Sequence, residues 1–268
     1  MKKLILSHEG IFPVTKDADG SMLSCPPATG LNCAGTIQGE GKLAGIPSLF
    51  VRLAMCNMRC TWKLPNDKLC CCDTNYAASQ THLCVDEAVE IISNNLGRVR
   101  HVVVTGGEPL LQKDALADFV RRLKSETGVH ITLETNGTIF DSNAVRNIDL
   151  FSLSPKLKNS ASDALNNDWI RRVNINVIQS FIDTARNTGK DIQLKFVVAQ
   201  AEEEAEIKEQ FLDKLCNLDV SDVLVMPLGA TNDDLQMTSR TAFAIAVKNG
   251  WRYSPRLHIN LFGNETGV

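Results

Sequence analysis

The amino-acid sequence predicts an α/β fold with about six parallel strands and helices packed outside them. Short apolar runs rich in β-branched residues alternate with amphipathic segments, at intervals of roughly 25 to 45 residues. Each apolar run ends in glycine, proline or polar residues, as expected where parallel strands present a functional edge. Six such units are too few for a closed eight-stranded barrel, so the pattern fits an open sheet or an incomplete TIM-type barrel.

Residues 1–34 show weak periodicity and contain three prolines, which predicts an irregular N-terminal extension with room for one short strand. The main domain spans 35–268 and begins with a glycine-rich turn, and no repeat or linker divides it. The expected strands are 48–54, 101–105, 129–133, 149–153, 192–198 and 222–226, and the expected helices are 85–96, 114–125, 166–188, 201–215 and 234–248.

Composition excludes several classes of protein. The 268 residues are 44% hydrophobic and 22% charged, with a formal net charge of −3, so a strongly basic nucleic-acid binder is not expected. No apolar run is long enough for a transmembrane helix, and residues 1–9 are too briefly apolar for a signal peptide. We therefore expect a cytoplasmic protein that contacts neither a membrane nor, directly, nucleic acid.

Nine cysteines are the most unusual feature of the composition, and five of them lie between Cys56 and Cys72. An odd number without a secretion signal argues against a disulfide framework, and the surrounding residues are polar. A C-x3-C pair (Cys56 and Cys60) precedes the triplet Cys70-Cys71-Cys72. This arrangement predicts a metal or cluster site, although the spacing alone does not choose between zinc and an iron–sulfur cluster.

The motifs of the chain resemble those of the radical S-adenosylmethionine (SAM) superfamily and, within it, the 7-carboxy-7-deazaguanine synthases. The resemblance rests on the turn Thr36–Gly41, on the segment Phe50–Cys60, and on Cys72-Asp73-Thr74. Four further motifs follow in the same order, namely Val104-Thr-Gly-Gly-Glu-Pro109, Leu133-Glu-Thr-Asn-Gly137, Ser154-Pro-Lys156 and Lys195-Phe-Val-Val198. The resemblance implies the incomplete barrel of the radical SAM core. The family pattern is C-x3-C-x2-C, so residues 61–71 are an insertion.

The resemblance also implies which residues bind cofactors. Cys56, Cys60 and Cys72 would hold a 4Fe–4S cluster; Cys72 is preferred as the third ligand because Asp73 and Thr74 follow it directly, with Cys71 as the first alternative and Cys70 as a further competitor. Thr74 would bind Mg²⁺ through its hydroxyl group. The residues expected at SAM are Asp73, Gly107, Glu108, Ser154, Pro155 and Lys156.

Substrate contacts are implied in the same way. The main chain of Ile37, Gln38 and Gly39 would meet the planar edge of a pterin, and Thr105 would add a hydrogen bond. Arg52 would pair with the substrate carboxylate in a bidentate fork; the alternative is a strand-edge arginine exposed to water. Glu40 and Glu134 are the expected catalytic residues, and a structural hydrogen bond is an equal alternative for Glu134.

The implied activity is the radical ring contraction of 6-carboxy-5,6,7,8-tetrahydropterin to 7-carboxy-7-deazaguanine with loss of ammonia, a lyase step of queuosine biosynthesis. The implied partners are a flavodoxin or ferredoxin as electron donor and a second copy of the chain in a homodimer. Two alternatives stay open on the cysteine pattern. One is a radical SAM activase of a glycyl radical protein, and the other is a zinc-binding interaction module.

Overall fold

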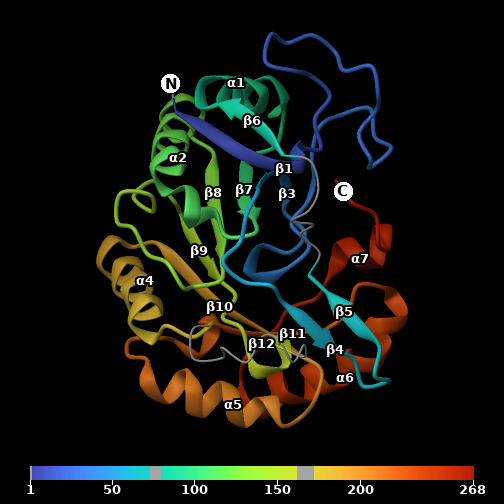
Figure 1. Ribbon diagram of the computed structural model, residues 1–268, viewed down its shortest axis with the longest axis vertical. Helices are drawn as coiled ribbons and strands as arrows, with labels where there is room; N and C mark the ends of the chain where they lie inside the picture. Colours follow the sequence, from blue (N-terminus) through green and yellow to red (C-terminus); the bar gives the residue numbers. More distant parts are fainter. Residues whose placement is uncertain (1, 73–79, 162–171) are drawn as a thin grey trace.

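The computed structural model describes residues 2–72, 80–161 and 172–268. A single large sheet forms its centre, with the strand order β12-β11-β10-β9-β8-β7-β3-β1-β6, and β2 pairs with β3 off this path (Figure 1). The strands of this sheet are β1 (Lys3–Phe12), β2 (Thr36–Ile37), β3 (Pro47–Leu53), β6 (Thr81–Cys84), β7 (His101–Gly106), β8 (His130–Thr135), β9 (Leu150–Leu153), β10 (Asp191–Val198), β11 (Val223–Pro227) and β12 (Arg252–Tyr253).

Six successive strands from β3 to β11 pair in parallel and in chain order, as the sequence predicts. Only the two-residue β12 extends this parallel series at its far edge. The sheet does not close on itself, because β12 and β6 remain its two edges. The predicted incomplete barrel is therefore confirmed, and all six carboxyl ends open toward one side.

The N-terminal residues differ from the expectation of an irregular extension. Lys3–Phe12 form a ten-residue strand, β1, that pairs antiparallel with both β3 and β6. The pairing of β1 with β3 shifts register between Leu6 and Ile11, and the polar stretch 7–10 lies between these two residues. Such a bulge interrupts the two-residue alternation, and the alternation is the signal by which a strand is found in sequence.

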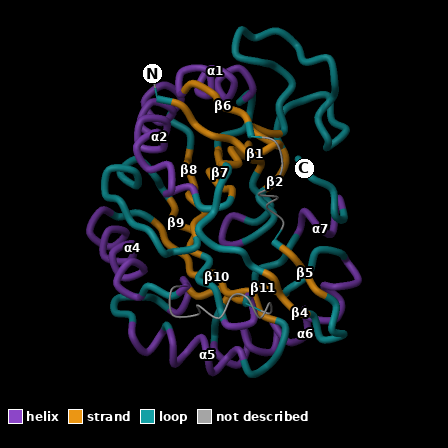
Figure 2. Tube along the Cα trace, in the orientation of Figure 1, coloured by secondary structure: helices purple, strands orange, loops and turns teal. Residues whose placement is uncertain are grey.

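Helices cover the outer face of the sheet (Figure 2). Their bounds are α1 (Val85–Asn95), α2 (Lys113–Thr127), α4 (Ile175–Thr188), α5 (Glu203–Gln210) and α6 (Asn232–Asn249). The short helix α7 (Leu257–Phe262) lies instead beside the strand ends, where it helps to line a cavity. The 3₁₀ turns are Gly41–Leu43, Pro109–Gln112, Lys158–Ser160, Leu212–Lys214 and Val220–Asp222.

Two predicted helices differ in length from those observed. Residues 166–171 of the expected helix 166–188 lie outside the described residues, and α4 begins at Ile175, where the Asn174 side chain accepts a hydrogen bond from the Val177 N–H. The expected helix 201–215 is α5, which ends at Gln210. The next side chain, Phe211, is fully buried with its ring 5.1 Å from that of Phe196, so packing overrides the helical period there.

The insertion 61–71 folds as a two-stranded hairpin of β4 (Thr61–Lys63) and β5 (Leu69–Cys71), in which Trp62 pairs with Cys70. Trp62 and Leu64 are buried with Leu228, from the segment after β11, in a small apolar cluster separate from the main core. The hairpin therefore lies across the open side of the barrel (Figure 1). Within the described residues, no helix has the length and apolar character needed to cross a membrane.

Candidate active site

A cavity of about 620 Å³ lies at the carboxyl ends of the parallel strands. Many of the predicted residues line it. They belong to β2 and the turn after it, to β3, β7 and β8, and to the loops that follow β3, β7 and β9. They are Ile37, Gln38, Gly39, Glu40, Arg52, Cys56, Cys60, Cys72, Thr105, Gly107, Glu134, Ser154 and Lys156. Glu108 and Pro155 do not line it, and Asp73 and Thr74 lie outside the described residues.

The hairpin explains how distant cysteines come together. Thr61 pairs with Cys71 at its base, and the Cys72 N–H donates to the Cys60 carbonyl at 3.2 Å, so the eleven inserted residues form a side excursion. Cys56 is close enough to both Cys60 and Cys72 to be affected electrostatically by them. Burial first, and then the charges of Glu108, Cys60 and Cys72, raise the pKa of the Cys56 thiol.

The described thiols do not form a compact site for a single metal ion. Among the described residues, no three histidine, cysteine or acidic side chains converge closely enough to hold one metal ion. A zinc site needs four ligands about one ion, whereas a four-iron cluster is a larger body that three cysteines can hold from wider positions. Cys70 and Cys71, both in strand β5 of the hairpin, also line the cavity. Cys70 is buried and Cys71 is exposed.

The two glycines at the end of β7, Gly106 and Gly107, allow the cysteine loop to pack closely against that strand. A Cβ atom on Gly107 would lie 2.0 Å from the Met55 carbonyl oxygen, and one on Gly106 would lie 2.0 Å from the Leu53 carbonyl oxygen. Gly106 also has a φ of +137°, which side chains rarely allow. The G-G pair therefore lets the chain between β3 and Cys56 pack directly against the end of β7.

Glu108 corrects one expectation, because its carboxylate is fully buried and does not face the cavity. Its oxygens accept hydrogen bonds from the Leu110 N–H at 3.1 Å, the Asn136 N–H at 2.8 Å and the Thr135 hydroxyl at 2.8 Å. Burial is the largest influence and raises the pKa of this carboxyl. The side chain ties the end of β7 to the end of β8 and is fully buried there.

Beside the thiols, Lys156 donates to the Ser154 hydroxyl at 2.9 Å, and its ammonium lies 5.8 Å from the ring centre of Trp62. The cavity thus receives one hydroxyl and one cation from the loop after β9, next to the hairpin. Pro155 lies between these two residues and shapes the loop without lining the cavity.

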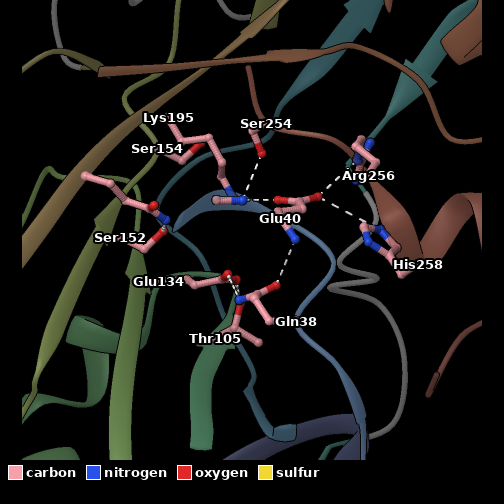
Figure 3. Close-up of polar contacts among 12 residues, drawn as sticks. Gln38, Glu40, Thr105, Glu134, Ser152, Ser154, Lys195, Ser254, Arg256 and His258 are labelled. Atoms are coloured by element: carbon pink, nitrogen blue, oxygen red, sulfur yellow. Dashed lines mark hydrogen bonds and ion pairs between the residues drawn. The ribbon is translucent and has the colours of Figure 1, made fainter. Parts of the chain in front are cut away.

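A polar network occupies the deeper part of the cavity (Figure 3). The Thr105 hydroxyl donates to one oxygen of Glu134 at 2.8 Å, and the Gln38 amide donates to the other at 3.0 Å. The Gln38 side-chain oxygen in turn accepts from the Glu40 N–H at 3.2 Å. The turn that carries Gln38 and Glu40 is therefore fixed to the ends of β7 and β8.

Glu40 is surrounded by Lys195, Arg256 and His258, none of which was a predicted site residue. Its carboxylate bonds to the Lys195 ammonium, lies 2.9 Å from the Arg256 Nε atom, and lies 3.9 Å from the His258 Nε2 atom (Figure 3). Burial alone would raise the pKa of the Glu40 carboxyl, but the charges of Lys195 and Arg256 hold it well below its usual range. Glu40 is thus a fixed anion at any physiological pH.

Lys195 carried a signal in the sequence, because it and Gln193 stand two residues apart in an apolar strand and so share one face of β10. Burial lowers the pKa of the Lys195 ammonium, but the nearby Glu40 and Glu134 carboxylates raise it overall. Arg256 and His258 lie in the C-terminal segment, which has no periodic or motif signal. Gly39 leaves room for His258, whose ring would lie 2.0 Å from a Cβ there.

Arg52 lines the cavity from β3, where two residues of β1 contact its side chain. Its Nε atom lies 3.9 Å from the Glu9 carboxylate, and its guanidinium carbon lies 5.6 Å from the ring centre of Phe12. The side chain is 20% exposed and lines the cavity, so the alternative of a water-exposed strand-edge arginine is wrong. Among the described residues, the Arg52 Nε atom is buried with no hydrogen-bond partner, which leaves it available to a carboxylate ligand.

Comparison with known proteins agrees with this architecture. The family model of the Radical SAM superfamily matches residues 53–242. The 7-carboxy-7-deazaguanine synthase of Halobacterium salinarum is 35% identical over 241 residues, which cover 85% of this chain and 88% of the relative. That of Rhodopirellula baltica is 35% identical over 240 residues, which cover 86% and 85%.

Solved structures show the same fold. The crystal structure of QueE from Escherichia coli matches with a TM-score of 0.58 and 19% identity, over 91% of this chain and 93% of that chain. The structure of anSMEcpe with bound AdoMet matches with a TM-score of 0.51 and 17% identity, over 82% and 65%. The chain therefore belongs to the radical SAM superfamily and, within it, to the family of the 7-carboxy-7-deazaguanine synthases.

Proposed function

We propose that this enzyme converts 6-carboxy-5,6,7,8-tetrahydropterin to 7-carboxy-7-deazaguanine by a radical ring contraction that releases ammonia. The observation that carries the proposal is one cavity with cysteine thiols at one end and a fixed polar network at the other. Such a network suits a small planar molecule with several N–H groups and a carboxylate, because its donors and acceptors are already oriented.

Cofactors would be held by the thiol end of the cavity. Cys56, Cys60 and Cys72 would bind a 4Fe–4S cluster, and Gly107, Ser154 and Lys156 would contact SAM, with Pro155 shaping the loop between the last two. When bound, this pair supplies a 5′-deoxyadenosyl radical that abstracts hydrogen from the substrate. Glu108 would support SAM binding through the strand ends that it joins. Asp73 would contact the cofactor and Thr74 would bind Mg²⁺, as the family resemblance implies.

The substrate would be oriented by the polar end. The main chain of residues 37–39 and the Glu40 carboxylate would meet the pterin edge, since an anion accepts hydrogen bonds from its amino and ring N–H groups. Thr105 and Glu134 would contact the ring under attack. Glu134 already accepts two hydrogen bonds, which hold its oxygens in place for handling a proton during the rearrangement.

Arg52 would bind the substrate carboxylate. Among the described residues its Nε atom has no hydrogen-bond partner and lies 3.9 Å from the Glu9 carboxylate. The guanidinium therefore keeps donors for a fork-shaped pair, in which it binds a carboxylate with two parallel hydrogen bonds. An Arg52→Lys variant would keep the charge and lose the fork. We expect KM for the pterin to rise roughly 10- to 100-fold with little change in kcat, following the 1.5–3 kcal/mol typical of a charged hydrogen bond.

The wider assignment follows the same family pattern. We propose residues 35–268 as the catalytic domain, to which β1 adds an antiparallel strand between β3 and β6. We also propose a homodimer that receives electrons from a flavodoxin or ferredoxin. The test is anaerobic turnover of the reconstituted protein with SAM, Mg²⁺, a reductant and the carboxytetrahydropterin. Product with the mass of 7-carboxy-7-deazaguanine is expected. A cluster-loaded protein that leaves the pterin unchanged would refute the proposal.

A further inference from the structure

The side chain of Arg172 is buried, with 6% of its surface exposed, and points at one of the proposed cluster ligands. Its Nη1 atom lies 3.5 Å from the Cys60 sulfur and also donates to the Ser160 carbonyl at 3.1 Å and to the Ser160 hydroxyl at 3.2 Å. Its Nη2 atom donates to the Arg59 carbonyl at 3.0 Å. The guanidinium is thus held in place by several neutral groups and one sulfur.

A buried cation normally has an anionic partner, because an unpaired charge in a protein interior costs several kcal/mol. Within the part of the chain that the structure describes, no ion pair includes Arg172. The carbonyl and hydroxyl groups around it satisfy its hydrogen bonds and leave its charge uncompensated. The Cys60 sulfur is the one contact that becomes anionic when it binds a metal cluster.

We propose that Arg172 is a positioning residue that raises the reduction potential of the cluster through its N–H···S contact with Cys60. This inference rests on the proposed function, which assigns Cys60 as a ligand. A cluster with three thiolate ligands gains one unit of negative charge when it accepts an electron from an external donor. A fixed positive charge at a ligand sulfur stabilises the reduced form more than the oxidised form, and hydrogen bonds to cluster sulfurs act in the same direction.

The contact places a cation beside one of the three proposed ligand sulfurs, that of Cys60. Arg172 precedes α4 and reaches Cys60 next to the 3₁₀ turn Lys158–Ser160. Cys60 itself is 6% exposed, so little water competes with the guanidinium for its sulfur. A hydrogen bond in such a dry position is stronger than one at the surface.

The experiment is an anaerobic redox titration of the reconstituted full-length protein, followed by the EPR signal of the reduced cluster. The variants are Arg172→Met, which removes charge and donors, and Arg172→Lys, which keeps the charge without the fork. Arg121→Met is the matched control, because Arg121 is 59% exposed on α2 and its loss changes the net charge equally. Iron and sulfide per chain are measured first for each variant.

At a fixed potential, we expect Arg172→Met to lower the ratio of reduced to oxidised cluster about tenfold. For a one-electron couple this corresponds to a reduction potential lower by about 59 mV. Arg172→Lys should show a smaller shift in the same direction, and Arg121→Met should show none. Equal potentials in Arg172→Met and Arg121→Met would overturn the inference. If Arg172→Met binds no iron, an unchanged potential in Arg172→Lys overturns it. A wild-type protein that holds no cluster would instead contradict the proposed function.

Discussion

The ion pair between Lys195 and Glu40 gives the sharpest test of how the polar end of the cavity is built. The Lys195 side chain is 6% exposed and that of Glu40 is 14% exposed, so water screens the pair poorly. Replacing Lys195 with methionine leaves the Glu40 carboxylate buried with Arg256, whose Nε atom lies 2.9 Å away, as its main remaining partner. Breaking a buried pair from one side typically costs about 3–5 kcal/mol, and the remaining arginine places this change near 3 kcal/mol.

The reverse change is more costly. Glu40→Gln leaves the Lys195 and Arg256 cations close together without the anion between them, so we expect a loss near 5 kcal/mol. The double variant removes both members of the main pair, and its loss should be smaller than the sum of the two single losses by about 2 kcal/mol. Urea unfolding of the four proteins, followed by circular dichroism, measures each free energy of unfolding.

A surface pair supplies the control. Lys63 and Asp67 lie 2.6 Å apart on the hairpin with side chains 55% and 83% exposed, so Lys63→Met should cost at most about 1 kcal/mol. If Lys195→Met costs no more than Lys63→Met, or if the Glu40 and Lys195 losses are simply additive, the buried ion-pair network does not hold this end of the cavity together.

Three further predictions follow from other parts of the structure. Cys72→Ala should abolish iron binding in the reconstituted protein while Cys70→Ala retains it, as measured by iron per chain; equal iron contents would show that the third ligand is wrongly assigned. Gly107→Ala should lower iron binding strongly, because a Cβ there meets the Met55 carbonyl at 2.0 Å; normal iron content would mean that the loop moves aside freely. Burial lowers the pKa of His101 from 6.5 in the unfolded chain to about 4 in the folded protein. As the pH falls from 6.5 to 4, the unfolded chain is therefore protonated first, and the folded protein loses about 3 kcal/mol of stability. His101→Gln should flatten unfolding free energy over that interval, and an unchanged slope would contradict this origin.

The sheet was predictable because its parallel strands are buried on both faces and appear as continuous apolar runs. Val102–Val104 is an example, and α2, whose buried residues recur with a regular helical period, follows it. One short strand was expected within residues 1–34, but the ten-residue length of β1 escaped prediction because its bulge breaks the alternation. The hairpin β4–β5 escaped because its three-residue strands are too short to show a period.

The candidate site divides along similar lines. Residues in compact motifs, such as Gln38 and Cys56, were predicted to meet, and they line one cavity. Glu108 belongs to such a motif, yet its side chain turns inward, because sequence spacing places a residue without fixing its rotamer. Arg256 and Arg172 come from segments distant in the chain, and only the packing of the C-terminal segment and of α4 brings them to the site.

The central claim is that this cavity performs a pterin ring contraction, and the most direct measurement is the product balance of a single anaerobic incubation. The reconstituted protein is supplied with SAM, Mg²⁺, reductant and the carboxytetrahydropterin, and deazapurine and ammonia are quantified by mass spectrometry and by an enzymatic ammonia assay. We predict equal amounts of 7-carboxy-7-deazaguanine and ammonia, rising together with time. Cleavage of SAM without either product, by a protein with a full complement of iron, would contradict the account.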